Sequence, residues 1–206
     1  MSSHSNASSV ATLASSTSAL PKSGSRLALV ALSLGGFGIG LTEFVIAGLL
    51  TEVAGDLGVS ITAAGRLVGA YALAVVPGAL LITPFLMKKP PKQALIMLLL
   101  FFIFGNGLSA WAPTYEIMFS GRIIAALAHG GYFGIGAVLA STLVPKKKQA
   151  SAVAALFAGL TIANVLGVPV GALIGQQFGW RVIFWIISVI GVIALLGIIT
   201  FVPLTQ

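Results

Sequence analysis

Residues 182–202 read VIFWIISVIGVIALLGIITFV and contain no charged side chain. A helix of this length measures about 32 Å at 1.5 Å per residue, which matches the hydrocarbon thickness of a bilayer. Five further apolar runs precede it, and none shows the alternation of a barrel strand. Because lipid requires internally satisfied backbone groups, we expect six membrane helices, at Leu27–Leu50, Ala63–Leu86, Gln93–Trp111, Ile117–Val144, Ala150–Gln176 and Val182–Val202.

The composition of the whole chain agrees with this prediction. Of 206 residues, 58% are apolar and 7% are charged, whereas soluble domains are about 45–50% apolar and about 25% charged. The mean hydropathy is +1.09. A net charge of +7 would indicate nucleic-acid binding in a soluble protein, but the eleven basic residues are too dispersed for such a face. The chain is therefore predicted to be an all-α, multi-pass membrane protein.

Several kinds of catalytic or cofactor site are excluded by composition. The chain has no cysteine, so it has no thiolate nucleophile and no cysteine-ligated metal. His4 and His129 are too few for a histidine metal cluster. We find no paired catalytic carboxylates, no Gly-x-Ser-x-Gly elbow and no phosphate-binding loop. We therefore expect no enzyme activity, no metal and no cofactor, and a membrane enzyme is disfavoured.

The first 25 residues differ in composition from the rest. They contain ten serines and few large apolar side chains, a composition that cannot offset the entropy cost of ordering. They also lack the apolar core of a signal peptide. We predict a disordered cytoplasmic tail over residues 1–25 and a transmembrane domain over residues 26–206.

The distribution of charge predicts the orientation. Arg66 and Arg181 flank the expected helices on one side, together with Glu52, Asp56 and Glu116. By the positive-inside rule, the opposite side is cytoplasmic and both termini lie there. Eight basic residues define that side: Lys22, Arg26, Lys88, Lys89, Lys92, Lys146, Lys147 and Lys148.

Two short patterns recur in the chain. Phe-Gly-Ile-Gly occurs at residues 37–40 and 133–136, and Gly-Ala-Leu occurs at residues 78–80 and 171–173. The expected helices that contain each pair run in opposite directions, which predicts a three-plus-three inverted repeat, a common transporter plan. The alternative is coincidence in a chain rich in glycine and alanine.

Two charged residues lie inside expected membrane helices. Glu43 and Arg122 are each about 9–10 Å from the outer end of their helix, so an ion pair between antiparallel helices is expected. One interpretation is a structural pair, and the other is a pair that couples transport to protons or substrate. Because arginine stays protonated, Glu43 is the member that would release and accept the proton.

Other polar residues lie at similar depth. His129 follows Arg122 by two helical turns, and imidazole ordinarily titrates near neutral pH. It either exchanges protons or is a neutral histidine bonded within the bundle. Asn106, Thr161 and Asn164 either line a polar substrate cavity or bridge helices, and the sequence does not separate these alternatives.

Glycine and proline residues predict a bend in the expected helix Ala150–Gln176. Gly167, Gly171 and Gly175 are spaced four apart, which lets helix backbones approach closely. Pro169 removes a backbone donor among them, and we expect it to bend this helix.

Four stretches resemble the major facilitator superfamily, in particular its bacterial drug, sugar and purine efflux branch of proton antiporters. They are GLTEFVI at residues 40–46, the segment from Gly121 and Arg122 to AHGGYFG at 128–134, ANVLGVPVG at 163–171, and FGWR at 178–181. The resemblance implies a twelve-helix exporter in a bacterial plasma or inner membrane, with two six-helix halves around a central cavity. It also implies that Arg122 takes part in proton coupling.

The sequence departs from that branch in two places and in length. The loop Met87–Lys92 keeps the usual positive charge but has no aspartate, and Val168 separates a glycine and a proline that usually adjoin. The chain stops at Gln206, where the central loop would begin, so we expect the N-terminal half of the fold. That half is a fragment, a truncated product, or a unit that pairs with a second half or a second copy.

Two functions follow from this expectation. The first is proton-coupled efflux of small organic molecules by a secondary transporter embedded in the bilayer, with no nucleic acid as partner. The second is a transport-inactive remnant or interaction subunit that requires a second half. The substrate is not specified by the sequence, because a cavity of apolar, glycine and asparagine residues suits many small molecules.

Overall fold

The structure, a computed structural model, describes residues 22–203. The serine-rich stretch up to residue 21, with His4, lies outside the described residues, and the predicted tail stays a prediction there; residues 22–25, which were also assigned to the tail, are helical. The first helix begins at Lys22, five residues before the expected Leu27.

The described residues form helices joined by short turns and contain no strand. Six of the continuous helical segments are long and apolar enough to cross a membrane. The first three spans comprise α1 (Lys22–Val45), η1 (Ile46–Leu49) and α2 (Leu50–Leu57); α3 (Ile61–Pro77), η2 (Gly78–Ile82) and α4 (Thr83–Leu86); and α5 (Pro91–Trp111). The last three comprise α6 (Tyr115–Thr142); η3 (Lys146–Lys148), α7 (Gln149–Ile162), η4 (Ala163–Gly167) and α8 (Val168–Phe178); and α9 (Trp180–Phe201).

The six expected spans are confirmed, and the largest boundary difference lies at the end of the first. This span continues to Leu57, seven residues past the expected Leu50. Gly58 ends it with a left-handed backbone, φ 64°, and Val59 N donates to Ala54 O at 3.0 Å. Glycine adopts this left-handed conformation without the steric cost that a Cβ atom would add, so helices commonly end at a glycine.

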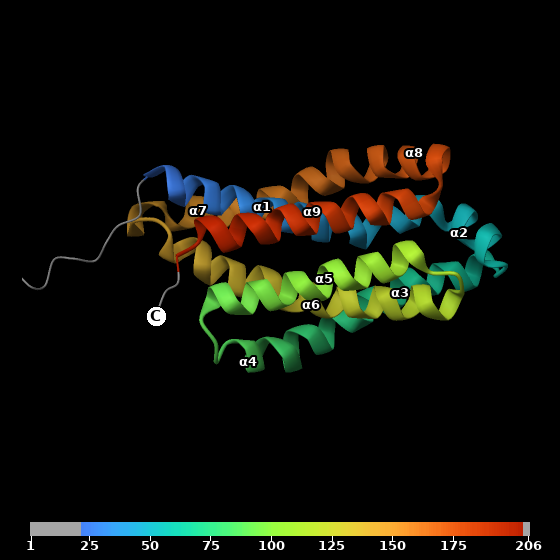
Figure 1. The fold of residues 1–206 in the computed structure, drawn as a ribbon, viewed down its shortest axis with the longest axis horizontal. Coiled ribbons are helices and arrows are strands. Elements are labelled where there is room, and N and C mark those ends of the chain that lie inside the picture. Colours follow the sequence, from blue (N-terminus) through green and yellow to red (C-terminus); the bar gives the residue numbers. More distant parts are fainter. Residues whose placement is uncertain (1–21, 204–206) are drawn as a thin grey trace, which may run out of the picture.

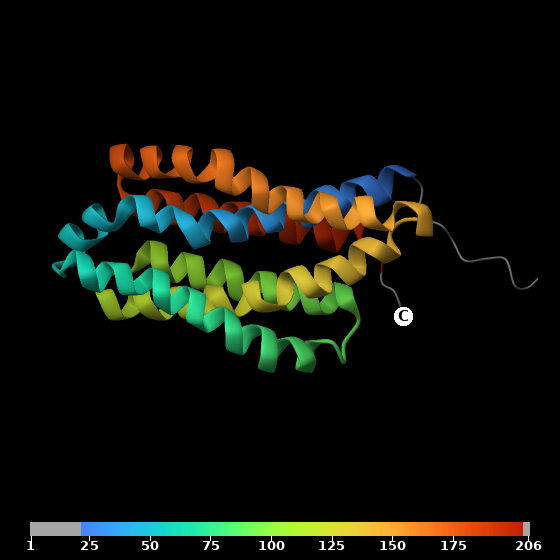
Figure 2. The same ribbon diagram turned by 180° about the vertical axis from the view of Figure 1, so that it is seen from behind.

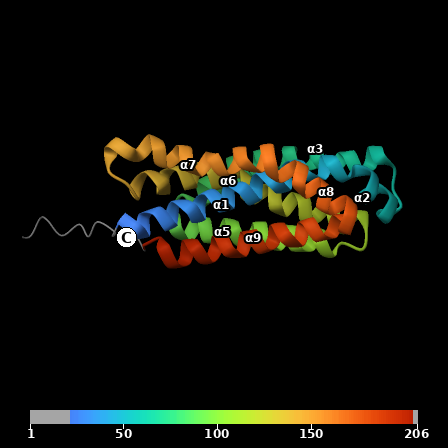
Figure 3. The same cartoon turned by 90° about the horizontal axis from the view of Figure 1, so that it is seen from above.

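The spans form two layers of three (Figure 1). One layer holds α1, α7 with α8, and α9, and the other holds α3 with α4, α5 and α6. Figure 3 shows α1 between α7 and α9. The packing repeats: α1 contacts α7 and α9, while α6 contacts α3 and α5. If the first, second and third spans are exchanged for the fourth, fifth and sixth, the two contacts of α1 become the two contacts of α6. The α5–α9 contact, which joins the layers, is unchanged by the exchange. The packing therefore has the symmetry of the expected inverted repeat.

Glycines permit the closest approaches between spans. A Cβ on Gly159 of α7 would collide with the Ser33 carbonyl of α1. A Cβ on Gly105 of α5 would lie 2.7 Å from the Gly121 oxygen of α6. Since lipid tails are as apolar as the side chains, such backbone contact supplies much of the packing energy between membrane helices.

The two most exposed spans share an irregularity. In the second span the π-helical turn η2 ends two residues before Pro84, and in the fifth span the π-helical turn η4 ends two residues before Pro169. Proline cannot donate to the preceding turn, and a wider turn accommodates the lost hydrogen bond. The bend expected at Pro169 is thus accompanied by a π-turn, which sequence reasoning did not predict.

The two ends of the bundle carry different polar contacts. At the end with α2, Arg181 and the Trp180 indole both donate to the Asp56 carboxylate, and Arg181 Nη2 donates to Ala112 O at 2.7 Å. These contacts tie the first, third and sixth spans together. At the other end, Lys92 is 7% exposed, and its Nζ donates to Ile199 O at 2.8 Å and Val202 O at 2.5 Å. Lys92 therefore caps α9 and is more than a loop charge.

Candidate functional site

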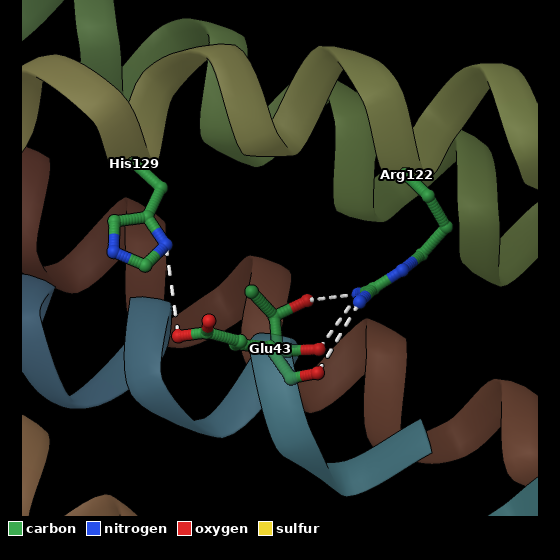
Figure 4. Close-up of polar contacts among 4 residues, drawn as sticks. Glu43, Arg122 and His129 are labelled. Carbon is green, nitrogen blue, oxygen red and sulfur yellow. Dashed lines mark hydrogen bonds and ion pairs between the residues drawn. The ribbon is translucent and has the colours of Figure 1, made fainter. Parts of the chain in front are cut away.

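Arg122 lies at the centre of the polar contacts between the two layers. Its side chain is fully buried on α6 and points toward α1 (Figure 4). Nη1 donates to Thr42 O at 2.6 Å and to Thr42 Oγ1 at 3.0 Å, and Nη2 donates to Glu43 O at 3.4 Å. The guanidinium thus holds the backbone of α1, and it does not contact the Glu43 carboxylate within ion-pair distance.

The acceptors of Arg122 lie where the first span changes its helical pitch. The α-helix α1 ends at Val45, where the tighter 3₁₀ turn η1 begins, and Thr42 and Glu43 belong to the last turn of α1. Arg122 therefore donates to the last turn of α1 from a fully buried position.

Aromatic rings surround the same guanidinium. Its Cζ lies 4.2 Å from the ring centroid of Tyr71 on α3 and 5.9 Å from that of Phe184 on α9. Rings at these distances stabilise a cation through their negative faces. The Nε of Arg122 and the hydroxyl of Tyr71 have no hydrogen-bond partner within the described part of the chain. Arg122, on the fourth span, thus contacts three other spans.

Glu43 faces His129 instead of Arg122. The Glu43 Oε2 and His129 Nδ1 atoms are 3.7 Å apart, and the two side chains are 22% and 15% exposed. Figure 4 shows the imidazole and the guanidinium on the same face of α6, with the carboxyl group turned toward the imidazole. This geometry differs from the expected direct pair of Glu43 with Arg122, because Arg122 is occupied by backbone carbonyls.

A row of rings extends from His129. Its imidazole centroid lies 6.0 Å from Tyr71 and 5.5 Å from Phe133, and Phe133 stacks on Phe157 of α7 at 5.1 Å. The partly exposed pair therefore lies in an apolar, aromatic setting, where water is scarce and a charge interacts strongly with its neighbours.

Of the three residues proposed to line a cavity, Asn106 is placed differently from the others. It is fully buried; Thr42 Oγ1 donates to its Oδ1 at 2.5 Å, and its Nδ2 donates to Phe102 O at 2.8 Å. Asn106 therefore bridges α5 to α1, which is the second of its two expected roles. Thr161 and Asn164 are exposed on α7 and η4, and their role at a cavity stays a prediction.

The glycines of the bent span pack against α1. A Cβ on Gly167 would lie 3.1 Å from Phe37, and a Cβ on Gly171 would lie 3.0 Å from Val45. These two glycines keep the fifth span close to the helix that carries Glu43. Pro169 itself is exposed.

Sequence reasoning missed the partners of the charged residues. Thr42 joins Asn106 and Arg122 in one hydrogen-bonded chain, and Tyr71 lies against both Arg122 and His129. Thr42 adjoins Glu43 in sequence, which is a weak signal, but no pattern in the sequence indicates Tyr71. No group of three or more metal-ligating side chains occurs among residues 22–203.

The chain is similar in sequence to bacterial transport proteins. It is 47% identical over 175 residues to the inner membrane transport protein YdhP of Escherichia coli strain K12, covering 85% of this chain and 45% of YdhP. It is 34% identical to a chloramphenicol resistance protein of Streptomyces lividans, with coverage of 86% and 45%. It is also 34% identical to a probable sugar efflux transporter of Pasteurella multocida, with coverage of 80% and 41%.

The fold is also similar to that of solved transporters. The proton:xylose symporter XylE, bound to 6-bromo-6-deoxy-D-glucose, superposes with a TM-score of 0.73 at 18% identity, over 86% of this chain and 45% of XylE. This likeness concerns the fold alone. The chain spans about half the length of the relatives that it matches. The family model of the Major Facilitator Superfamily matches residues 32–206, and the chain belongs to that superfamily of membrane transporters.

Proposed function

We propose that the chain forms the first half of a secondary transporter that exports small organic molecules in exchange for protons. The observation that carries the proposal is the Glu43–His129 pair, a partly exposed acid and base inside membrane spans, held beside a buried permanent cation. Ionisable groups at such positions are costly and mark ion or substrate pathways. The names of the efflux and resistance relatives favour export over uptake.

The three residues take different parts in the proposed coupling. Glu43 gains and loses the proton, and His129, 3.7 Å away, is the base that faces it. Arg122 keeps its charge and holds the α1 backbone at Thr42 and Glu43. Protonation of Glu43 cancels its attraction to the Arg122 cation, so the force between α1 and α6 changes with the proton. Such a change biases a two-state element, as coupling requires.

The orientation of the proposed transporter follows from the loop charges. The turn between α4 and α5, which contains Lys88 and Lys89, and the start of the α7 span at η3 lie at the same end of the bundle as the start of α1 and the end of α9 (Figure 1). Asp56 and Glu116 lie at the opposite end. The positive-inside rule supports a cytoplasmic position for the basic end and for both termini, in a bacterial inner membrane.

A second six-helix half completes the proposed transporter. The second and fifth spans are the least covered, with Leu73, Leu80, Val165 and Leu173 all more than half exposed. These side chains suit either lipid or a further set of helices. The matched relatives are about twice as long as this chain, which favours a second half over a second copy.

Everted membrane vesicles provide the test. The chain is produced together with the part of YdhP that it does not match, and chloramphenicol or a monosaccharide is added to respiring vesicles. Proton-coupled efflux predicts that an added substrate dissipates the pH gradient, measured by acridine orange fluorescence, and that either half alone has no effect. Substrate movement that is independent of the pH gradient would contradict proton coupling.

The alternative of a transport-inactive interaction subunit makes a different prediction. Such a subunit would leave the gradient unchanged in every combination, and it would alter the activity of a separate full-length transporter produced in the same cells. Measuring both effects in one set of vesicles distinguishes the two functions.

A further inference from the structure

A cavity lies at the basic end of the bundle, away from Glu43 and His129. Its volume is about 130 Å³, and Lys89 forms part of its rim. The other lining residues come from three spans and are apolar: Leu86, Met87, Pro91, Ala94, Gly134, Ile135 and Val138. Because most of this lining is apolar, the cavity favours the hydrocarbon part of a ligand.

The cavity exists because the second span diverges from α6. At Gly130, a Cβ would collide with the backbone of Val75 and Ala79, so the two spans are in backbone contact there. One turn later, a Cβ on Gly134 would have no neighbour within 4 Å. Beyond this contact the π-helical turn η2 leads into Pro84 and α4, and Figure 2 shows α4 leaning away from α6. The opening is thus built by the π-turn and the proline.

Charge at the mouth indicates what the occupant carries besides hydrocarbon. Lys89 lines the cavity and Lys88 beside it is exposed. All four acidic residues of the chain lie elsewhere: Glu43 inside the bundle and Glu52, Asp56 and Glu116 toward the opposite end. Basic pockets between membrane helices bind anionic headgroups. An apolar cavity with a lysine at its rim therefore matches an anionic phospholipid.

We propose that the cavity between α4, α5 and α6 binds one anionic phospholipid, with an acyl chain against Gly134 and the phosphate on Lys89. The lysine replaces the bulk counterions of the phosphate, and the acyl chain fills the space that the diverging α4 leaves open. The site is independent of the proton pair, so lipid binding and transport can be measured separately.

Native mass spectrometry of the detergent-solubilised chain tests the proposal. The probes are dioleoyl phosphatidylglycerol and dioleoyl phosphatidylcholine, which share acyl chains and differ in net charge. We expect one tightly bound phosphatidylglycerol per chain. Lys89→Gln should weaken that lipid about fivefold, since one lysine near a phosphate contributes about a factor of this size, and it should leave phosphatidylcholine unchanged.

Two further variants separate the cavity from general surface charge. Gly134→Phe fills the opening and should abolish retention of the bound lipid, whereas Gly69→Phe adds the same bulk at an exposed glycine of α3 that has no close neighbour and should not. Lys147→Gln removes an exposed charge at the same end of the bundle and should have little effect. Circular dichroism confirms that each variant is helical.

Several results would overturn the site. Equal binding of the two lipids, an equal effect of Lys147→Gln and Lys89→Gln, or full retention by Gly134→Phe would each do so. Competition by glycerol 3-phosphate as strong as that by phosphatidylglycerol would show a phosphate site without an acyl chain. Loss of the lipid when a second half is bound would show that the occupant of the cavity is protein.

Discussion

Arg122 places a permanent charge in a fully buried position and bonds it mainly to backbone carbonyls. A lysine at this position keeps the charge but loses the planar fork that reaches both Thr42 and Glu43. We expect Arg122→Lys to lower the free energy of unfolding by about 1–3 kcal/mol, because at least one buried carbonyl loses its donor. It should also impair proton-coupled transport. Thermal unfolding in detergent measures the first effect.

Arg66→Lys is the control at the residue scale. Arg66 is exposed at the opposite end of the bundle from the lysine loops, so this change should move the unfolding midpoint little. Equal stability of the Arg122→Lys variant and the unmodified chain would contradict the contact that we assign to the guanidinium and the α1 backbone.

At the scale of elements, backbone contact between α1 and α7 depends on Gly159. A methyl group there would collide with the Ser33 carbonyl, and overpacking of this kind costs about 1–3 kcal/mol. We expect Gly159→Ala to lower the unfolding midpoint in detergent. Gly69→Ala on α3, where a Cβ meets no neighbour, should be neutral or stabilise by up to about 1 kcal/mol through helix propensity. A lower unfolding midpoint for Gly69→Ala than for Gly159→Ala would refute this packing.

The end of α9 makes a second prediction about an element. Lys92 donates to the carbonyls of Ile199 and Val202, and Lys92→Met removes both hydrogen bonds while keeping the length of the side chain. We expect a loss of about 1–3 kcal/mol and faster amide hydrogen exchange in the last turn of α9. Lys88→Met changes an exposed neighbour and should alter neither quantity. Unchanged amide hydrogen exchange in the Lys92→Met variant would show that the Lys92 hydrogen bonds do not stabilise the last turn of α9.

At the scale of the whole molecule, the chain offers a direct test of its orientation. It has no cysteine, so single cysteines can be labelled without background. A cysteine at Lys147 should react with a membrane-impermeant maleimide only when the cytoplasmic side is open, and a cysteine at Thr62 should react from outside. This expectation rests on the eight basic residues at one end of the bundle, because basic loops lie on the cytoplasmic side. Labelling of the cysteine at Lys147 from outside would show that the topology is the reverse of the one predicted.

How much the sequence could predict depends on the range of the interaction. The spans follow from hydropathy alone, because every backbone group in lipid must be paired within its own helix. The spacing of Arg122 and His129 along α6 follows from 1.5 Å per residue, whereas the expected distance of Glu43 from the end of its helix was too short, because that span ends at Leu57 and not at Leu50. The partner of Arg122 does not follow from the sequence, because its contact with the α1 backbone at Thr42 and Glu43 depends on how α6 packs against α1. The burial of Asn106 likewise depends on how α5 meets α1.

The most direct test of the proton-coupling account is the response of transport to Glu43→Gln, which removes the charge at nearly constant volume. The chain is reconstituted with a second half in liposomes, and chloramphenicol movement is followed with and without an imposed pH gradient. The account predicts that Glu43→Gln abolishes gradient-driven transport and keeps substrate exchange at equal pH. Full gradient-driven transport by Glu43→Gln would show that Glu43 has a structural role and that the proton is carried elsewhere.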